Sequence, residues 1–189
     1  AQYGFAAGHR AKVLHWGSFV WGDATETDVS STAPNDVTFR ATGGFRVLSG
    51  TGTGVVLPAG GGSWLTISDR NKKEAFVPVD ADAVLEKVAA LPMTTWNMKT
   101  QDPSIRHMGP MAQDFRAAFG LGEDERMINT TDADGVALAA IQGLVHRVRA
   151  LQDENASLTK ENEDIKTRLA RIEEQLKRAS ETASATERR

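Results

Sequence analysis

The chain lacks cysteine altogether, which excludes disulfides and zinc sites built on thiolates. Its four histidines, His9, His15, His107 and His146, show no HxH or HxxxH spacing, so we expect neither a metal site nor a cofactor. No apolar run approaches the roughly 18 residues of a membrane span, and we see no signal peptide, so the opening residues suggest an internal fragment of a longer protein. The 189 residues carry a net charge of −3 without a basic stripe, which argues against nucleic acid as a partner.

Residues 1–49 contain a repeat. Placing GFAAGHRA above SFVWGDAT aligns Phe5 with Phe19 and Gly8 with Gly22, at an offset of 14 residues. Short strands that end in glycine turns at a fixed period predict a β-roll or a solenoid-like stack, with a coincidental β-hairpin as the alternative. Two copies cannot bury a core alone, so further repeats or other subunits are needed. The stretch resembles the head repeats of trimeric autotransporter adhesins, which implies a trimeric β-roll at the end of a fibre or head.

A glycine-rich connector separates this repeat from the rest of the chain. Before it, NDVTFRATGGFRVLS predicts two short strands around a Gly-Gly turn. Within residues 50–67, GTGTGVVLPAGGGS predicts a flexible or turn-rich linker. Trp64, Leu65 and Ile67 then predict a short apolar strand that leads into Ser68.

Residues 68–135 have the pattern of a small α+β domain. VDADAVLEKVAALP predicts a helix that Asp80 or Asp82 caps and Pro92 ends, and GPMAQDFRAAFGLG predicts a second helix. MTTWNMKT, with β-branched and aromatic residues, predicts a strand. RMINTTDADG predicts another strand that closes in a turn.

Over residues 136–178 the apolar period becomes a heptad seam, which predicts a coiled-coil helix. A surface helix on its own domain is the alternative, but the stripe is narrow and too long for a small domain to cover. Asn155 and Asn162 at a-type positions fix register and oligomer number without saying whether two or three chains assemble. Residues 179–189 are polar and predict a disordered tail. The seam consists of Ile141, Leu144, Val148, Leu151, Asn155, Leu158, Asn162, Ile165, Leu169, Ile172 and Leu176.

Two separated motifs carry a family resemblance. SDRNKKE provides Ser68, Asp69 and Lys73 of an S-D-x-x-x-K pattern. RHMGPMAQDF matches an H-x-G-x-x-A-Q-[DE] pattern through His107, Gly109, Ala112, Gln113 and Asp114. With the long helix that follows, residues 68 to about 150 resemble the C-terminal intramolecular chaperone and auto-processing domain of phage endosialidase tailspikes, the peptidase S74 type. Domains of this type also occur in other trimeric fibres and in a membrane-tethered eukaryotic transcription factor.

The resemblance implies a specific activity. Such domains form homotrimers, template the β-structure that precedes them and then cut themselves off before the motif serine, here at the Ile67–Ser68 bond. The resemblance assigns Ser68 as nucleophile and Lys73 as general base, with supporting roles for Asp69 and His107. His107 has an equally good structural interpretation, in which its hydrogen bond holds the loop before the second helix.

The chemistry of a serine–lysine pair agrees with a link to assembly. A serine hydroxyl needs a neighbouring base, and lysine acts as one only when neutral, far from its reference pKa of about 10.4. Burial can bring a lysine to a pKa of roughly 7, which costs roughly 4 to 5 kcal/mol of folding free energy. A small protomer alone is a poor source of that energy, so we expect cleavage to wait for the trimer.

Two residues depart from the family pattern, and both bear on whether the site is active. Lys72 stands where the family more often has an apolar residue, and Ala75 where it more often has asparagine. A second cation beside the base either lowers the pKa of that base or disturbs its packing, and the missing amide removes a hydrogen bond. SDRNKKE also has a simpler interpretation as a solvated turn without chemistry.

Along the chain these patterns predict a mixed fold of β-repeat, connector, α+β domain and trimeric coiled coil. The leading functional hypothesis is a self-cleaving trimerisation chaperone that acts on an upstream passenger in cis. The alternative is a non-cleaving structural trimerisation module of a tail fibre or surface adhesin. A DNA-binding coiled coil is a poor third, because it needs a basic region before the zipper and HRVRALQDEN offers only Arg147 and Arg149. The expected location is a phage tail fibre or the bacterial surface or exterior.

Overall fold

The computed structural model describes residues 1–186 and, within its last helix, side chains as far as residue 179. The chain divides into an N-terminal unit, Ala1–Phe76, and a C-terminal unit, Val77–Arg189. This division follows Phe76, whereas the sequence predicts a boundary between Ile67 and Ser68. The functional domain limits given above stay predictions.

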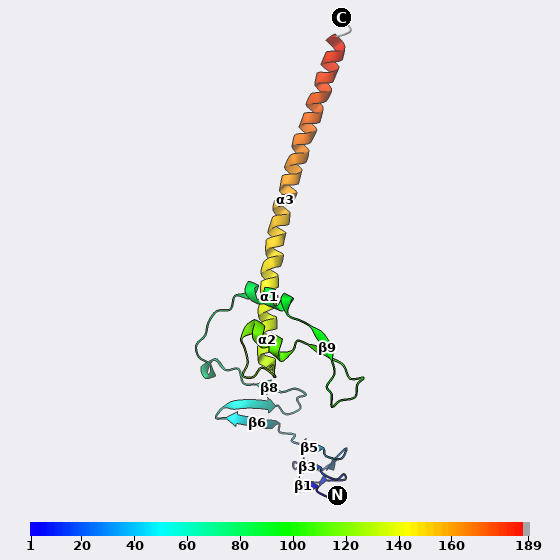
Figure 1. The fold of residues 1–189 in the computed structure, drawn as a ribbon, viewed down its shortest axis with the longest axis vertical. Helices are drawn as coiled ribbons and strands as arrows, with labels where there is room; N and C mark the ends of the chain where they lie inside the picture. The colour runs from blue at the N-terminus through cyan, green and yellow to red at the C-terminus, as the bar shows by residue number, and fades with distance from the viewer. Residues whose placement is uncertain (187–189) are drawn as a thin grey trace. The chain divides into compact units, whose positions relative to one another are not determined.

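The N-terminal unit begins with a stack of parallel strands (Figure 1). Strands β1 (Phe5–Gly8), β3 (Phe19–Gly22) and β5 (Val37–Arg40) form one sheet in the order β1-β3-β5, and β2 (Ala11–Lys12) pairs with β4 (Val29–Ser30). The register of β1 on β3 joins the residue pairs that the 14-residue offset aligns. Because β1 and β3 run parallel, the β-hairpin alternative is wrong. The sheets are small and open, and a trimeric β-roll stays a prediction.

This stack buries a small core and is tied together by internal hydrogen bonds. Val20 is fully buried, and Ser18 beside it is 1 % exposed. Gly8 has φ +84, and a Cβ built there would lie 1.9 Å from the carbonyl oxygen of Gly22, so the approach of the two strands requires glycine. The Arg40 side chain donates to Asp23 Oδ1 at 2.9 Å and to the carbonyl of His9 at 3.2 Å, which ties successive turns of the stack together.

A second, antiparallel sheet follows within the N-terminal unit. It consists of β6 (Phe45–Gly50), β7 (Thr53–Leu57) and β8 (Leu65–Thr66), with β7 in the middle. The sequence correctly predicts strands at β5, β6 and β8, but the flexible linker predicted for residues 50–63 is wrong over β7. Gly54 there has φ +142, and a Cβ would lie 2.1 Å from Val47 O. The glycines therefore permit a bulged, close strand pairing instead of breaking it.

In the C-terminal unit, the predicted helix and strand signals place α1, α2 and β9 correctly. Helix α1 (Ala81–Ala90) is capped by Asp80, whose Oδ1 accepts from Ala83 N at 3.0 Å, and it ends before Pro92. Helix α2 (Ala112–Phe119) ends at Gly120 with φ 67, as glycine at a helix end permits. Strand β9 (Thr94–Trp96) pairs antiparallel with β10 (His107–Gly109).

The strand predicted from RMINTTDADG is wrong, because this segment begins α3 (Thr130–Thr186). Asn129 Oδ1 accepts from Thr131 N at 2.9 Å, so the polar cluster opens a helix. Helix α1 packs on the early part of α3, where a Cβ on Gly143 would lie 2.4 Å from the carbonyl oxygen of Ala81.

Beyond Gly143, no described residue of helix α3 is buried by other parts of the chain. Every residue from 144 to 179 is exposed in the single chain, and Figure 1 shows this part of α3 extending past α1 and α2. With 57 residues, α3 is about 85 Å long. The disordered tail predicted for residues 179–189 falls on the end of this helix and on residues 187–189, largely outside the described side chains, and stays a prediction.

Candidate active site

A short turn after β8 carries the predicted nucleophile and base. Asp69 caps the 3₁₀ helix η1 (Arg70–Lys72), and its Oδ1 accepts from the backbone N of Asn71 at 2.9 Å. The backbone N of Lys73 closes the turn on the carbonyl of Arg70 at 3.1 Å. An aspartate followed by such a turn is a local capping arrangement that needs no distant partner. It folds the chain back so that residue 73 returns to residue 68.

The result is a direct contact between the two predicted catalytic side chains. Lys73 Nζ donates a hydrogen bond to Ser68 Oγ over 2.7 Å. This separation lies within the range required for a base that removes a hydroxyl proton. Asp69, predicted to support the pair, holds the turn and makes its hydrogen bonds to Asn71.

A pocket of about 340 Å³ lies beside this turn. The predicted scissile residue Ile67 and the predicted base Lys73 both line it. The β6–β7–β8 sheet and the turn therefore form one concave surface within the N-terminal unit. The remaining lining residues are Ser49, Thr53, Gly54, Val55, Thr66, Asp69 and Lys72.

In the single chain this site is open to solvent. Ser68 and Lys73 are both exposed, and Ile67 is 39 % exposed. A serine–lysine pair works best where water is excluded, because a charged lysine is not a base. The geometry of the pair is therefore present without the burial that its chemistry needs.

The two departures from the family pattern occupy defined places beside the site. Lys72 lies against the turn between β6 and β7, since a Cβ on Gly52 would lie 3.3 Å from its Nζ. Lys72 and Lys73 thus bring two ammonium groups to one pocket. Ala75 has φ 54, a left-handed conformation that asparagine and glycine adopt more readily than alanine. The family's asparagine therefore suits the backbone at this position, besides any hydrogen bond that it makes.

His107 belongs to the C-terminal unit, whereas Ser68 and Lys73 belong to the N-terminal one. Its Nε2 lies 2.8 Å from Gln101 Oε1, and its ring packs 4.8 Å from the ring of Trp96. These contacts fix the hairpin of β9 and β10 just before α2. They agree with the structural interpretation of His107, and a role beside the serine–lysine pair stays a prediction.

The predicted seam lies along the uncovered part of α3. Its apolar members are about half exposed, as for Leu151 and Leu158 at 49 % each. Asn155 and Asn162 are likewise exposed. The remaining apolar members, from Leu144 and Val148 to Ile165, Leu169, Ile172 and Leu176, are between 45 % and 65 % exposed. A continuous apolar stripe of this length lacks a partner within the described chain.

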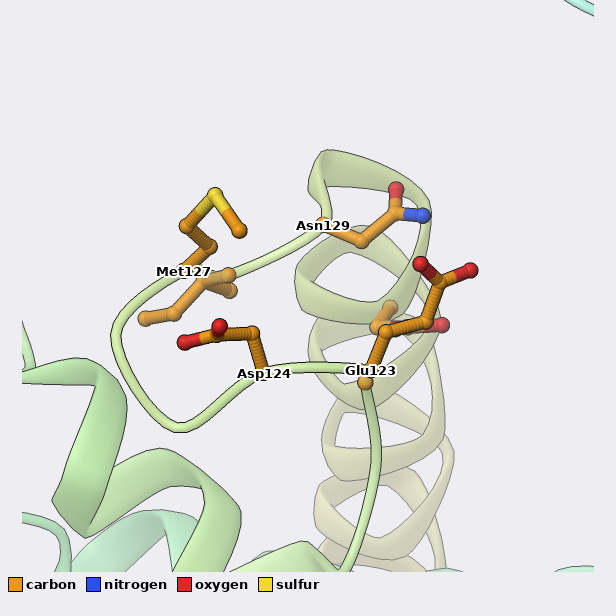
Figure 2. A pocket seen from close by; sticks show the side chains of 7 residues that line it. Glu123, Asp124, Met127 and Asn129 are labelled. Atoms are coloured by element: carbon orange, nitrogen blue, oxygen red, sulfur yellow. The ribbon is translucent and has the colours of Figure 1, made fainter. Parts of the chain in front are cut away.

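A further pocket, of about 570 Å³, lies at the start of α3 (Figure 2). Glu123, Asp124, Met127 and Asn129 surround it, and its lining provides no nucleophile with a base. Hydrogen bonds from Arg126 hold the pKa of the Asp124 carboxyl below its usual range. Among residues 1–186, no group of three histidine, cysteine or acidic side chains is arranged to hold a metal ion. No helix in this part of the chain is both long and apolar enough to span a membrane.

Sequence reasoning missed the part of the site that β6 and β7 supply. Ser49, Thr53 and Val55 line the pocket because β7 pairs with both β6 and β8. The signal for this pairing was Val55, Val56 and Leu57, an apolar run inside the glycine-rich segment. The glycines around it concealed the strand.

Comparison with known proteins relates part of the chain to a known family. No curated protein matches the chain significantly. A family model described as the chaperone of endosialidase matches residues 68–121, and the match begins at Ser68. It includes both quoted motifs and the turn that brings Lys73 to Ser68. Residues 68–121 are therefore similar to the chaperone domains of the peptidase S74 family.

Proposed function

We propose that this chain is the C-terminal part of a trimeric fibre or adhesin, whose S74 domain directs assembly and then releases itself by cutting at Ile67–Ser68. The β-stack of residues 1–49 is the end of the passenger. The domain from Ser68 onward is the chaperone, and α3 holds three copies together. Ser68 is the nucleophile and Lys73 the base of a single-turnover reaction.

The main support for the proposed chemistry is one hydrogen bond. Lys73 Nζ lies 2.7 Å from Ser68 Oγ, at the residue where the family match begins. A solvated turn without chemistry has no need for this contact. The capped 3₁₀ helix η1 supplies it from local sequence alone.

The reaction follows from the positions of these atoms. Neutral Lys73 takes the proton of the Ser68 hydroxyl, and Oγ attacks the carbonyl carbon of Ile67. The bond between that carbon and Ser68 N breaks, the nitrogen gains a proton, and an ester links Ile67 to Ser68 Oγ. Water then hydrolyses the ester, which leaves a carboxylate on Ile67 and a free amino group and hydroxyl on Ser68.

Assembly provides the burial that a single chain lacks. The pair is exposed in the single chain, and the seam of α3 is exposed as well. Covering the seam with further copies concentrates the domains, and covering the pair removes water from the lysine. Since burial lowers the pKa of a lysine, cleavage would follow assembly.

The non-cleaving module remains the second candidate, and the open site favours it. Both reacting side chains are exposed, and Lys72 adds a second positive charge to the pocket. In that reading the same trimer forms and the passenger stays attached. Only the state of the Ile67–Ser68 bond distinguishes the two functions.

The test compares wild type with Ser68→Ala and Lys73→Met by intact mass spectrometry of fresh protein. We expect wild type to give a fragment that begins at Ser68, and both variants to stay full length while still assembling. Ser63→Ala is the matched control and should cut like wild type. Undiminished cutting in Ser68→Ala would refute the proposed nucleophile, and an intact wild type would establish the non-cleaving module.

A further inference from the structure

A continuous row of five aromatic rings runs through the N-terminal unit, from its first strand to the strand before the proposed scissile bond. Each ring comes from a different segment, and consecutive ring centroids lie 5.0, 5.3, 5.1 and 6.0 Å apart. These separations are typical of interacting aromatic pairs. We call the set the aromatic row; it consists of Phe5, Phe19, Phe39, Phe45 and Trp64.

The last ring of the row lies just before β8, the strand that leads to the proposed cleavage site. Trp64 directly precedes β8, and β8 pairs with β7 through only two residues, Leu65 and Thr66. Extending this register by one residue places Trp64 opposite Leu57, which itself pairs with Phe45. The edge-on contact of Trp64 with Phe45 is thus a further attachment for a weakly held strand.

The other rings depend on the fold of the passenger. Phe45 of β6 stacks on Phe39 of β5, and Phe39 makes a tilted ring contact with Phe19 of β3 in the parallel stack. Phe39 occupies its place only when β5 is paired with β3. The support that Trp64 receives is therefore complete only when the passenger strands have formed.

We propose that the aromatic row makes cleavage depend on the folding of the passenger, with Trp64 as the positioning residue. This inference rests on the proposed cleavage at Ile67–Ser68. The strand that ends at Ile67 must hold its carbonyl carbon in line with Ser68 Oγ, and small displacements slow such a reaction strongly. A passenger with unformed strands leaves Trp64 without its supported contact with Phe45, so the bond stays intact until the passenger has folded.

The experiment compares four variants of the full chain by the rate at which the Ser68 fragment appears. Trp64→Leu removes the last ring, and Phe39→Leu removes a ring far from the site. Trp16→Leu is the matched control, because Trp16 is 54 % exposed against 51 % for Trp64 and makes no ring contact among the described residues. Trp64→Phe retains a ring and serves as the conservative variant.

Aromatic pairs of this kind change an equilibrium by about 2- to 12-fold. We therefore expect Trp64→Leu and Phe39→Leu each to slow cutting by about that factor, with Trp16→Leu and Trp64→Phe close to wild type. The double variant Phe39→Leu/Trp64→Leu should be no slower than Trp64→Leu alone, since both break one row. Equal rates in Trp64→Leu and Trp16→Leu would overturn the proposal. So would an unchanged rate in Phe39→Leu, because Trp64 would then act only locally.

A second measurement separates this inference from the proposed cleavage itself. In a Ser68→Ala background no cutting is expected, and amide hydrogen exchange of residues 64–67 reports how firmly the strand is held. We expect Phe39→Leu to speed this exchange by about 2- to 12-fold and Trp16→Leu to leave it unchanged. If wild type does not cut but this difference appears, the proposed cleavage is refuted, and the role of the aromatic row in holding the strand is supported. If cutting occurs and this difference in exchange is absent, the role of the aromatic row is refuted while the proposed cleavage is supported.

Discussion

The β-stack of the N-terminal unit and the part of α3 from residue 144 to residue 179, here called the stalk, are both built from short repeats, but only the stack buries residues of its own within one chain. In the stack Val20 is fully buried, and Arg40 bonds to groups from earlier turns. In the stalk every described residue beyond Gly143 is exposed. A chain that coils back can bury its own residues, whereas a straight helix cannot. We therefore expect the stalk to be the main surface through which copies of the chain would assemble.

The largest effect is expected from a charged residue in the seam. Leu158→Glu removes a half-exposed leucine from each copy and places carboxylates together. Completing the burial of three leucines is worth about 2 to 5 kcal/mol, so we expect association to weaken by about 30-fold or more. Light scattering with size-exclusion chromatography measures the loss of the trimer.

The matched control for that variant is Ala156→Glu, which adds the same charge outside the seam. We expect it to assemble like wild type. If both variants remain trimers, the seam is not the assembly surface and the comparison between stack and stalk is wrong.

A smaller effect concerns the stack and pH. Hydrogen bonds from the Thr42 hydroxyl and backbone, with others from Thr25 and Arg40, hold the pKa of Asp23 well below its usual range. Asp28 and Asp36 also have lowered pKa values, chiefly through bonds from Lys12 and from the backbone of Thr32 respectively. A lowered pKa contributes stability above the unfolded value of about 3.9, and that stability is lost as the pH falls below it.

We therefore expect acidification from about pH 6 to about pH 3 to loosen the stack, seen as loss of near-ultraviolet circular dichroism. Asp23→Asn should be less stable than wild type at about pH 6 and should show a weaker dependence on pH. An equal dependence in wild type and Asp23→Asn would show that this carboxylate does not carry the effect.

The smallest expected effect lies at Ala75, close to the division between the two units. Its φ of 54 is costly for alanine, so Ala75→Gly should stabilise the N-terminal unit by about 0.5 to 1 kcal/mol. The same change at Ala83, inside α1, should destabilise the protein by about 1 kcal/mol. Thermal unfolding measures both, and the opposite signs are the result to check.

The sequence predicts this fold well wherever neighbouring residues determine the local structure. The alignment of Phe5 with Phe19 gives the observed strand register, and Asp80 with Pro92 gives the bounds of α1. The contact of Ser68 with Lys73 is equally local, since Asp69 caps the turn that creates it. In each case the determining residues lie within a few positions of one another or repeat at a fixed offset.

The predictions were wrong where glycine or β-branched residues are compatible with more than one local structure. Gly52 and Gly54 look like a linker, but they provide the turn and bulge that let β7 pair on both sides. Thr130 and Thr131 suggest a strand, yet Asn129 caps a helix there. The pocket lining from β6 and β7 could not be predicted, because it depends on the antiparallel pairing of β7, which the sequence predicted as part of a connector.

The most direct measurement compares cutting at Ile67–Ser68 in assembled and unassembled protein. Wild type and Leu158→Glu are expressed in parallel, and the mass of each oligomer is recorded with the yield of the fragment that begins at Ser68. We predict that wild-type trimers yield the fragment and that Leu158→Glu monomers do not. Equal yields from folded monomers and trimers would contradict this prediction.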